Sequence, residues 1–141
     1  MPNGAGGGGG GGIVGVGNTF TGPAEALEII GDHCYAYSGN ITDAGTSGPN
    51  TTMFNFKTGN FYVVGLFRWD TNNESPIVVD VRIKFNDAII YDCEWNTAPT
   101  HGMSVNPLDV IIPPYTQVLM EFGANSSCEA AAQLTGRIYR G

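Results

Sequence analysis

The first seventeen residues constrain this chain more than any other segment, because ten of the fourteen residues from Gly4 to Gly17 are glycine. Glycine loses the most backbone entropy on ordering, and it has no side chain to bury. A segment of this composition cannot build a core of its own. We therefore expect residues 1–22 to form an extended arm that is ordered only against a partner, and residues 23–141 to form one folded domain.

A short apolar patch closes the glycine run and provides side chains that can anchor the arm. Glycine lets a backbone approach another surface closely, and isoleucine and valine add apolar contacts there. The sequence thus predicts a partner-binding arm, which is typical of a component of a larger assembly. The predicted contact residues of the arm are Gly6, Gly7, Gly8, Gly9, Gly10, Gly11, Gly12, Ile13, Val14 and Val16.

After residue 22 the sequence consists mostly of short segments that alternate apolar and polar residues, as half-buried strands do. In Ile77–Phe85 the apolar residues face one way and the charged residues face the other. Asn86 and Asp87 favour a two-residue hairpin turn into a return strand over Ala88–Cys93. The other expected strands are His33–Ser38, Thr52–Phe56, Phe61–Trp69, Ser104–Ile112, Gln117–Phe122 and Ala132–Tyr139.

About eight strands with regular turns predict an all-β protein, an antiparallel β-sandwich of the jelly-roll-like kind. We expect loops at Gly39–Thr51, Asp70–Pro76 and Glu94–Met103, where glycine, asparagine, threonine and proline gather. The segment after Pro23, up to Ile30, fits either one helical turn or a first strand. Two consecutive prolines at 113 and 114 end the strand before them or place it at a sheet edge.

The net charge of −7 argues against binding to nucleic acid or to an anionic membrane surface. Both kinds of binding need clustered basic residues, and the six lysines and arginines of this chain are scattered. No run of residues is long and apolar enough for a membrane helix, and the first residues do not resemble a secretory signal. We therefore expect a product that is cytoplasmic or is assembled in the cytoplasm before release.

The sequence predicts neither an enzyme nor a cofactor or metal site. Cys34, Cys93 and Cys128 lack metal-ligand spacing, and we expect reduced thiols, with a Cys34–Cys93 or Cys93–Cys128 disulfide as the alternative. His33 precedes Cys34 directly, so the two side chains point to opposite faces of a strand and cannot form a catalytic pair. No serine lies in a nucleophile-elbow pattern. Asp92 and Glu94 share one face of an expected strand, and we expect solvated carboxylates there, with a calcium site completed by a third group as the alternative.

The candidate surface contacts are aromatic and histidine side chains near expected strand ends and loops. Such side chains favour contact with a protein partner or a sugar. The alternative is that they close the ends of the sandwich as part of its core. The candidates are Trp69, Trp95, His101 and Tyr115.

The chain resembles the small decoration, or cement, proteins of tailed-phage capsids. The resemblance is one of pattern over residues 33–141 and is carried by an asparagine-, threonine- and glycine-rich jelly-roll-like domain behind an N-terminal arm. The segments Ile111–Thr116 and Leu134–Gly141 look like the closing strands of small viral β-sandwiches. The glycine arm itself departs from any pattern of that family.

The resemblance implies a structural protein of the virion, assembled in the host cytoplasm. It implies a homotrimer that binds the major capsid protein and stabilises its lattice. An alternative is a receptor- or carbohydrate-binding module of a viral fibre or tail, with recognition by the loops Asn40–Asn50 and Glu94–Met103. A secreted trimeric jelly roll of the tumour-necrosis or complement type is a third possibility, which the missing signal disfavours.

Overall fold

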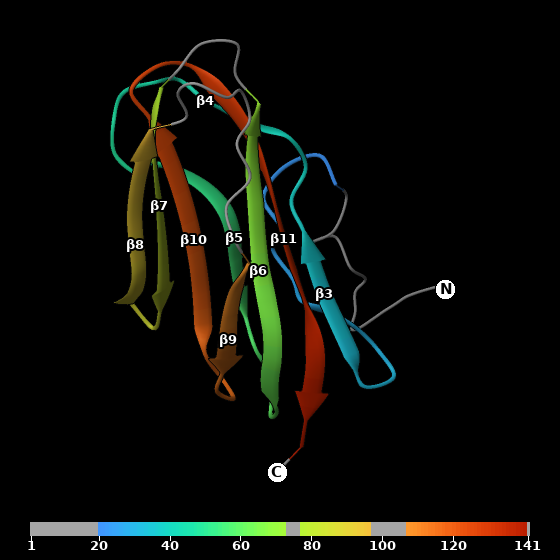
Figure 1. Cartoon of the computed structure of the whole chain (residues 1–141). Coiled ribbons are helices and arrows are strands. Elements are labelled where there is room, and N and C mark those ends of the chain that lie inside the picture. The colour runs from blue at the N-terminus through green and yellow to red at the C-terminus, as the bar shows by residue number, and fades with distance from the viewer. Residues whose placement is uncertain (1–19, 73–76, 97–106, 141) are drawn as a thin grey trace.

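The computed structural model describes residues 20–72, 77–96 and 107–140, and this part of the chain is all β. Its ten strands form two antiparallel sheets that pack face to face, so the predicted β-sandwich is confirmed (Figure 1). The strands are β2 (Glu28–Ile30), β3 (His33–Tyr37), β4 (Ile41–Asp43), β5 (Thr51–Lys57), β6 (Tyr62–Asn72), β7 (Val78–Phe85), β8 (Ala88–Asn96), β9 (Leu108–Ile112), β10 (Gln117–Ala124) and β11 (Cys128–Tyr139).

The strands pair in the nested order of a jelly roll. The four-stranded sheet runs β5-β10-β7-β8, and the six-stranded sheet runs β2-β3-β11-β6-β9, with β4 added beside β11. Leaving out the short strands β2 and β4, the first strand pairs with the eighth, the second with the seventh, the third with the sixth and the fourth with the fifth. This is how a long hairpin folds when it wraps into two Greek keys.

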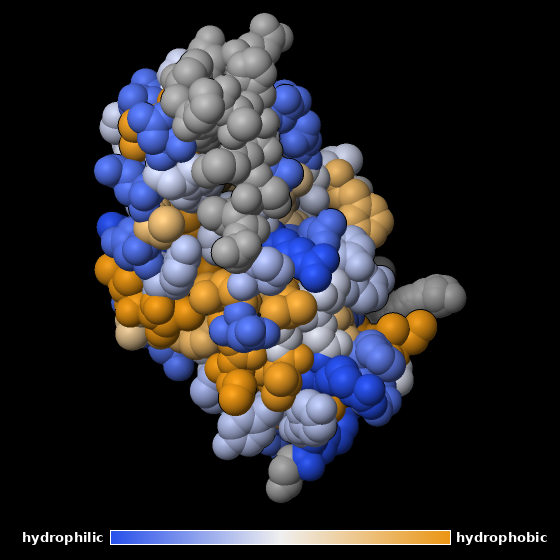
Figure 2. All heavy atoms as spheres, in the orientation of Figure 1, coloured by the Kyte–Doolittle hydropathy of each residue, from blue (hydrophilic) through white to orange (hydrophobic). Residues whose placement is uncertain are grey.

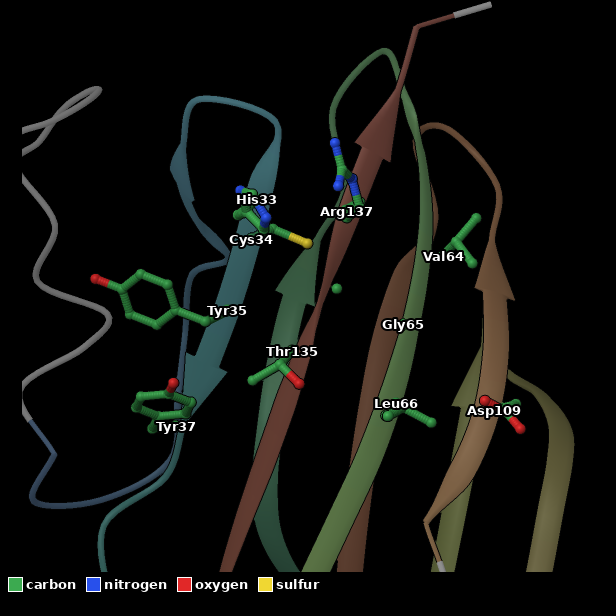
Figure 3. A pocket seen from close by; sticks show the side chains of 11 residues that line it. His33, Cys34, Tyr35, Tyr37, Val64, Gly65, Leu66, Asp109, Thr135 and Arg137 are labelled. Carbon is green, nitrogen blue, oxygen red and sulfur yellow. The ribbon is translucent and has the colours of Figure 1, made fainter.

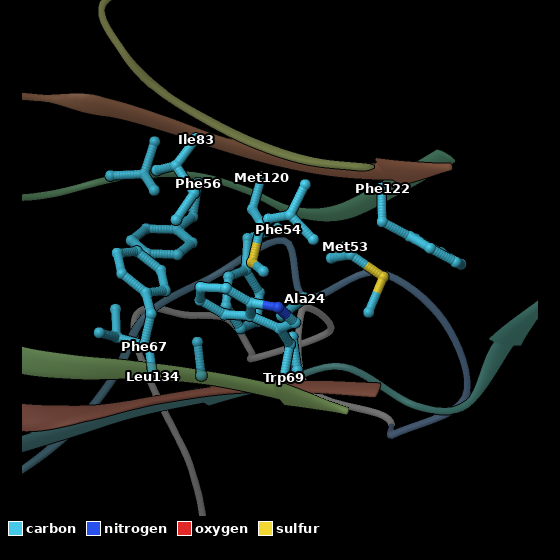
Figure 4. Close-up of a cluster of buried hydrophobic side chains, with 14 of the residues drawn as sticks. Ala24, Met53, Phe54, Phe56, Phe67, Trp69, Ile83, Met120, Phe122 and Leu134 are labelled. Carbon is cyan, nitrogen blue, oxygen red and sulfur yellow. The ribbon is translucent and has the colours of Figure 1, made fainter. Parts of the chain in front are cut away.

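The core lies between the two sheets and is built by the period-two pattern of the strands (Figure 4). The rings of Phe54 in β5 and Phe67 in β6 meet across the interior, with centroids 5.9 Å apart. Alternate residues of β7 and β10 are buried against them, as the sequence predicted. The buried residues from these two strands are Val79, Val81, Ile83, Val118, Met120 and Phe122.

The hairpin between β7 and β8 forms at the predicted residues. Phe85 pairs with Ala88, and Asn86 and Asp87 have φ angles of 50° and 68°. Two successive left-handed residues make the hairpin turn whose twist matches that of the strands. The side-chain oxygen of Asn86 also accepts the backbone N–H of Gln117 at 2.8 Å, which ties the turn to β10.

Buried polar side chains hold two corners of the sandwich. Asp43, at the end of β4, accepts hydrogen bonds from the backbone N–H of Gly45 and Ala124 and from the hydroxyl of Thr51. Thr58, after β5, donates to the carbonyl of Pro113 and accepts the N–H of Thr116. These contacts replace water at groups that would otherwise be buried without partners.

Several expected boundaries are wrong, and in each case pairing overrides local composition. Ile41–Asp43 lies in an expected loop but is strand β4, because it pairs with the start of β11. Residues 70–72, an expected turn, continue β6 opposite β11, which itself begins at Cys128 rather than Ala132. For the segment after Pro23, the strand forms rather than the helical turn, so that one of the two alternatives is confirmed over Glu28–Ile30.

The prolines and the cysteines behave as the sequence indicated. Strand β9 ends at Ile112, directly before the two prolines, and lies at the edge of its sheet.

Cys34, Cys93 and Cys128 are free, with the first and the last buried. Burial raises the pKa of the Cys34 thiol to about 11. The pKa of the Cys128 thiol is also raised to about 11. Burial is the largest cause, and the negative charges of Asp43 and Glu129 add to it. Among the described residues there is no helix that could cross a membrane.

Candidate functional site

Exposed tyrosine and aliphatic side chains gather at one end of the six-stranded sheet. Tyr62 in β6 lies opposite Tyr139 in β11, and Val64 in β6 lies opposite Ile111 in β9. Their exposure ranges from 44% for Val64 to 64% for Ile111. Tyr115 is 59% exposed at the same end, where its backbone N–H donates to the carbonyl of Gly59 just before β6. We call these five residues the tyrosine patch.

The strand alternation explains why these side chains lie on the surface. Val63 and Ile138 point into the core, so their neighbours Tyr62, Val64 and Tyr139 must point outward. Tyr115 has a φ of 54° in the turn between β9 and β10. In Figure 2, hydrophobic residues spread over the middle and lower part of the visible face and extend to its left side, where β8 lies in Figure 1. Isolated apolar residues on a surface are ordinary, but a connected group is typical of a binding surface.

The outer face of the four-stranded sheet has a different character. On β7, Asp80, Arg82 and Lys84 point outward, since their neighbours are buried in the core. Arg82 forms an ion pair with Asp92 of β8 at 3.1 Å. This face also carries exposed apolar side chains, Ile89 and Ile90 of β8, whereas the exposed tyrosines of the patch lie at the six-stranded sheet.

A shallow open hollow of about 520 Å³ lies on the outer face of the six-stranded sheet, next to the tyrosine patch (Figure 3). Tyr35 and Tyr37 of β3 form one side, with ring centroids 5.1 Å apart. Leu66 and Asp109 stand on the other side, and Thr135 of β11 lies between. The full lining is His33, Cys34, Tyr35, Tyr37, Val64, Gly65, Leu66, Asp109, Thr135, Gly136 and Arg137.

Two glycines set the shape of the floor of this hollow. Gly65 of β6 pairs with Gly136 of β11. A Cβ on Gly136 would lie 2.7 Å from the Cα of Gly65, and a Cβ on Gly65 would lie 2.7 Å from the carbonyl oxygen of Thr135. The two strands thus approach more closely than any side chain would allow, as glycine permits.

One rim of the hollow carries charged and ionisable side chains. Arg137 donates to Asp32 at 2.9 Å, and both side chains are more than half exposed. His33 is exposed at the start of β3, whereas Cys34 beside it points into the core, so the two point to opposite sides as expected. Among the residues that the structure describes, no three histidine, cysteine or acidic side chains are grouped as a metal site would need.

Of the four candidate contact residues, only Tyr115 is exposed among those that the structure describes. Trp69 was wrongly expected on the surface: it is 4% exposed, and its ring lies 5.7 Å from that of Tyr91 in the core. Trp95 is not in a loop but in β8, where it pairs with Val79 and packs half-buried against the core. His101 lies outside the described residues, as do all the arm residues Gly6–Val16.

The sequence singled out Tyr115, in the turn between β9 and β10, but none of the exposed or half-buried tyrosines on the strands. Tyr35, Tyr37, Tyr62 and Tyr139 occupy the solvent positions of alternating strands, where polar residues are more usual. That signal is visible in the sequence. Their assembly on one face is not, because it depends on the pairing of strands that are up to a hundred residues apart.

No family model matches this chain, and no curated protein matches it either. The geometry of the described residues is therefore the basis for a functional proposal.

Proposed function

We propose that this chain is a decoration protein of a virion, which binds the major capsid lattice as a homotrimer and stabilises it. In this proposal it catalyses no reaction and holds no cofactor, and it is assembled with the capsid in the host cytoplasm. The observation that carries the proposal is the tyrosine patch, in which three exposed tyrosines and two exposed aliphatic side chains gather at one end of the six-stranded sheet.

A group of exposed tyrosines at one end of a sheet suits a protein that docks on a larger body. Tyrosine is enriched at protein interfaces because its ring buries a large area while its hydroxyl keeps a hydrogen-bonding partner. The patch offers three tyrosines and two aliphatic side chains within one end of the fold. The charged outer face of β7 and β8 is left to solvent, where charges keep the assembled surface soluble.

The jelly-roll pairing and the arm support the same proposal. Jelly-roll sandwiches occur in viral capsid and lectin domains, so the fold agrees with a virion component but does not single it out. In this proposal the glycine run Gly6–Gly12 of the arm supplies a second contact, to another chain of the assembly. Its ordering entropy would be offset by main-chain hydrogen bonds formed across chains.

The glycan-binding alternative has less support. It relied on Trp95, His101 and Tyr115, and the ring of Trp95 packs half-buried against the core. Of these three, Tyr115 alone remains as an exposed ring in the described part of the chain. The loop residues proposed for sugar recognition therefore do not form a shared exposed surface within the described part of the chain.

The test is co-sedimentation of the purified protein with undecorated shells of a tailed-phage major capsid protein. We expect binding by the full chain, and a loss of at least tenfold in affinity for the double variant Tyr62→Thr with Tyr139→Thr. The matched control, Ile89→Thr with Ile90→Thr, removes two exposed apolar side chains elsewhere and should bind normally. Absence of binding by the full chain would overturn the proposal.

A further inference from the structure

The hollow on the six-stranded sheet lies close to the point where the chain enters the described domain. Phe20, the first described residue, packs its ring 6.2 Å from that of Tyr37, which lines the hollow. The backbone of Phe20 lies directly over Gly39, where a Cβ would overlap it. Gly39 also donates its N–H to the carbonyl of Gly22 at 2.9 Å. The root of the arm is thus fixed at one end of the hollow.

We propose that the hollow is the binding site for the Ile13–Val16 segment of the chain's own arm. The inference does not depend on the virion function proposed above. It commits to this occupant because the arm is the chain segment outside the described residues that begins beside the hollow. The arm of a neighbouring copy could fill the hollow only if two molecules packed in a particular way. The chain's own arm is already attached beside the hollow and needs only to be long enough to reach it.

The length of the arm matches the distance to be covered. Four residues separate Phe20 from Val16, which span at most about 14 Å, and Ile13 can lie up to about 25 Å away. The hollow extends along β3 from Tyr37 to His33, about 13 Å, and across two strand spacings to β6, about 10 Å. The arm is therefore long enough for Val16, and with length to spare for Ile13, to reach any part of the hollow.

The chemistry of the lining also matches this segment. Val64, Leu66 and the tyrosine rings offer apolar surface to Ile13 and to the valines of the arm. The glycines at 12, 15 and 17 allow the arm backbone to approach the polar groups of Thr135, Asp109 and Arg137. Tethering raises the effective concentration of the segment to the millimolar range, so even a weak contact is populated.

The experiment is NMR on the full chain. A sample that mixes ¹⁵N,¹³C-labelled and unlabelled chains separates contacts within one chain from those between chains. We expect nuclear Overhauser effects between the methyl groups of Ile13, Val14 and Val16 and the rings of Tyr35 and Tyr37 within one labelled chain. The variant Ile13→Ser with Val14→Ser and Val16→Ser should lose them and shift the amide signals of the hollow.

Two further variants make the test specific. Leu66→Thr changes the wall of the hollow and should weaken the same contacts, while Gly8→Ser lies in the arm outside the segment and should leave them intact. Contacts seen only between different chains would overturn the inference in favour of arm exchange. Absence of any contact, with hollow signals that respond instead to an added glycan panel, would overturn it in favour of a sugar site. No contact and no response to either would overturn it outright.

Discussion

Gly65 and Gly136 lie opposite each other in β6 and β11, and neither position leaves room for a Cβ. At Gly136 the added atom would meet the backbone of Val64 and the Cα of Gly65, neither of which can rotate away. The pair therefore fixes the closest approach of two central strands, and it forms the floor of the hollow beside the tyrosine patch.

We predict that Gly136→Ala lowers the free energy of unfolding by about 1 to 3 kcal/mol, since the strands must separate or bend to admit a methyl group. Urea unfolding followed by tryptophan fluorescence measures this. Gly22→Ala is the matched control, because a Cβ at that position would meet no atom within 4 Å. Its change in unfolding free energy should stay within about 0.5 kcal/mol. Equal effects of the two substitutions would contradict the close approach.

Asp43 should be the polar side chain on which the fold depends most. Replacing it with alanine leaves the buried N–H of Ala124 and the hydroxyl of Thr51 without an acceptor, so we expect a loss of about 2 to 4 kcal/mol in unfolding free energy. Asp43→Asn keeps one acceptor oxygen and should lose less. Denaturant titration compares the two, and an alanine variant as stable as the parent would refute this role.

Stability should fall at alkaline pH because of the two buried thiols. Below about pH 9 the thiols of Cys34 and Cys128 are protonated in both the folded and the unfolded state. Between about pH 9 and pH 11 only the unfolded state releases these protons, because the folded pKa values are raised, so unfolding becomes more favourable. Burial also raises the pKa of Tyr91 to about 12, so this side chain further lowers the free energy of unfolding at higher pH.

Denaturant unfolding at several pH values checks this trend. The double variant Cys34→Ala with Cys128→Ala should show a clearly smaller decline between pH 9 and pH 11 than the parent. Cys93→Ala, at a half-buried position, serves as the comparison. A parent protein whose unfolding free energy is constant across this range would count against the burial of the two thiols.

The sequence predicted the β7–β8 hairpin because its alternation and its turn residues agree with each other. It did not predict β4, because Ile41–Asp43 becomes a strand only through its pairing with Cys128–Ala130. Trp69 was misplaced since its expected position at a strand end ignored the continuation of β6, which turns its ring inward with Phe67. The hollow and the tyrosine patch need strands from distant parts of the chain, and no local pattern contains that information.

The most direct test of the proposed assembly is the native mass of the full chain, measured by light scattering on a sizing column. We predict a trimer, about three times the 14.9 kDa chain. Because the tyrosine patch is proposed to face the capsid and not the sister subunits, the trimer should persist in Tyr62→Thr with Tyr139→Thr as well as in Ile89→Thr with Ile90→Thr. A full chain that stays monomeric would contradict the proposed homotrimer, and a trimer that dissociates on the tyrosine substitutions would contradict the capsid-facing role of the patch.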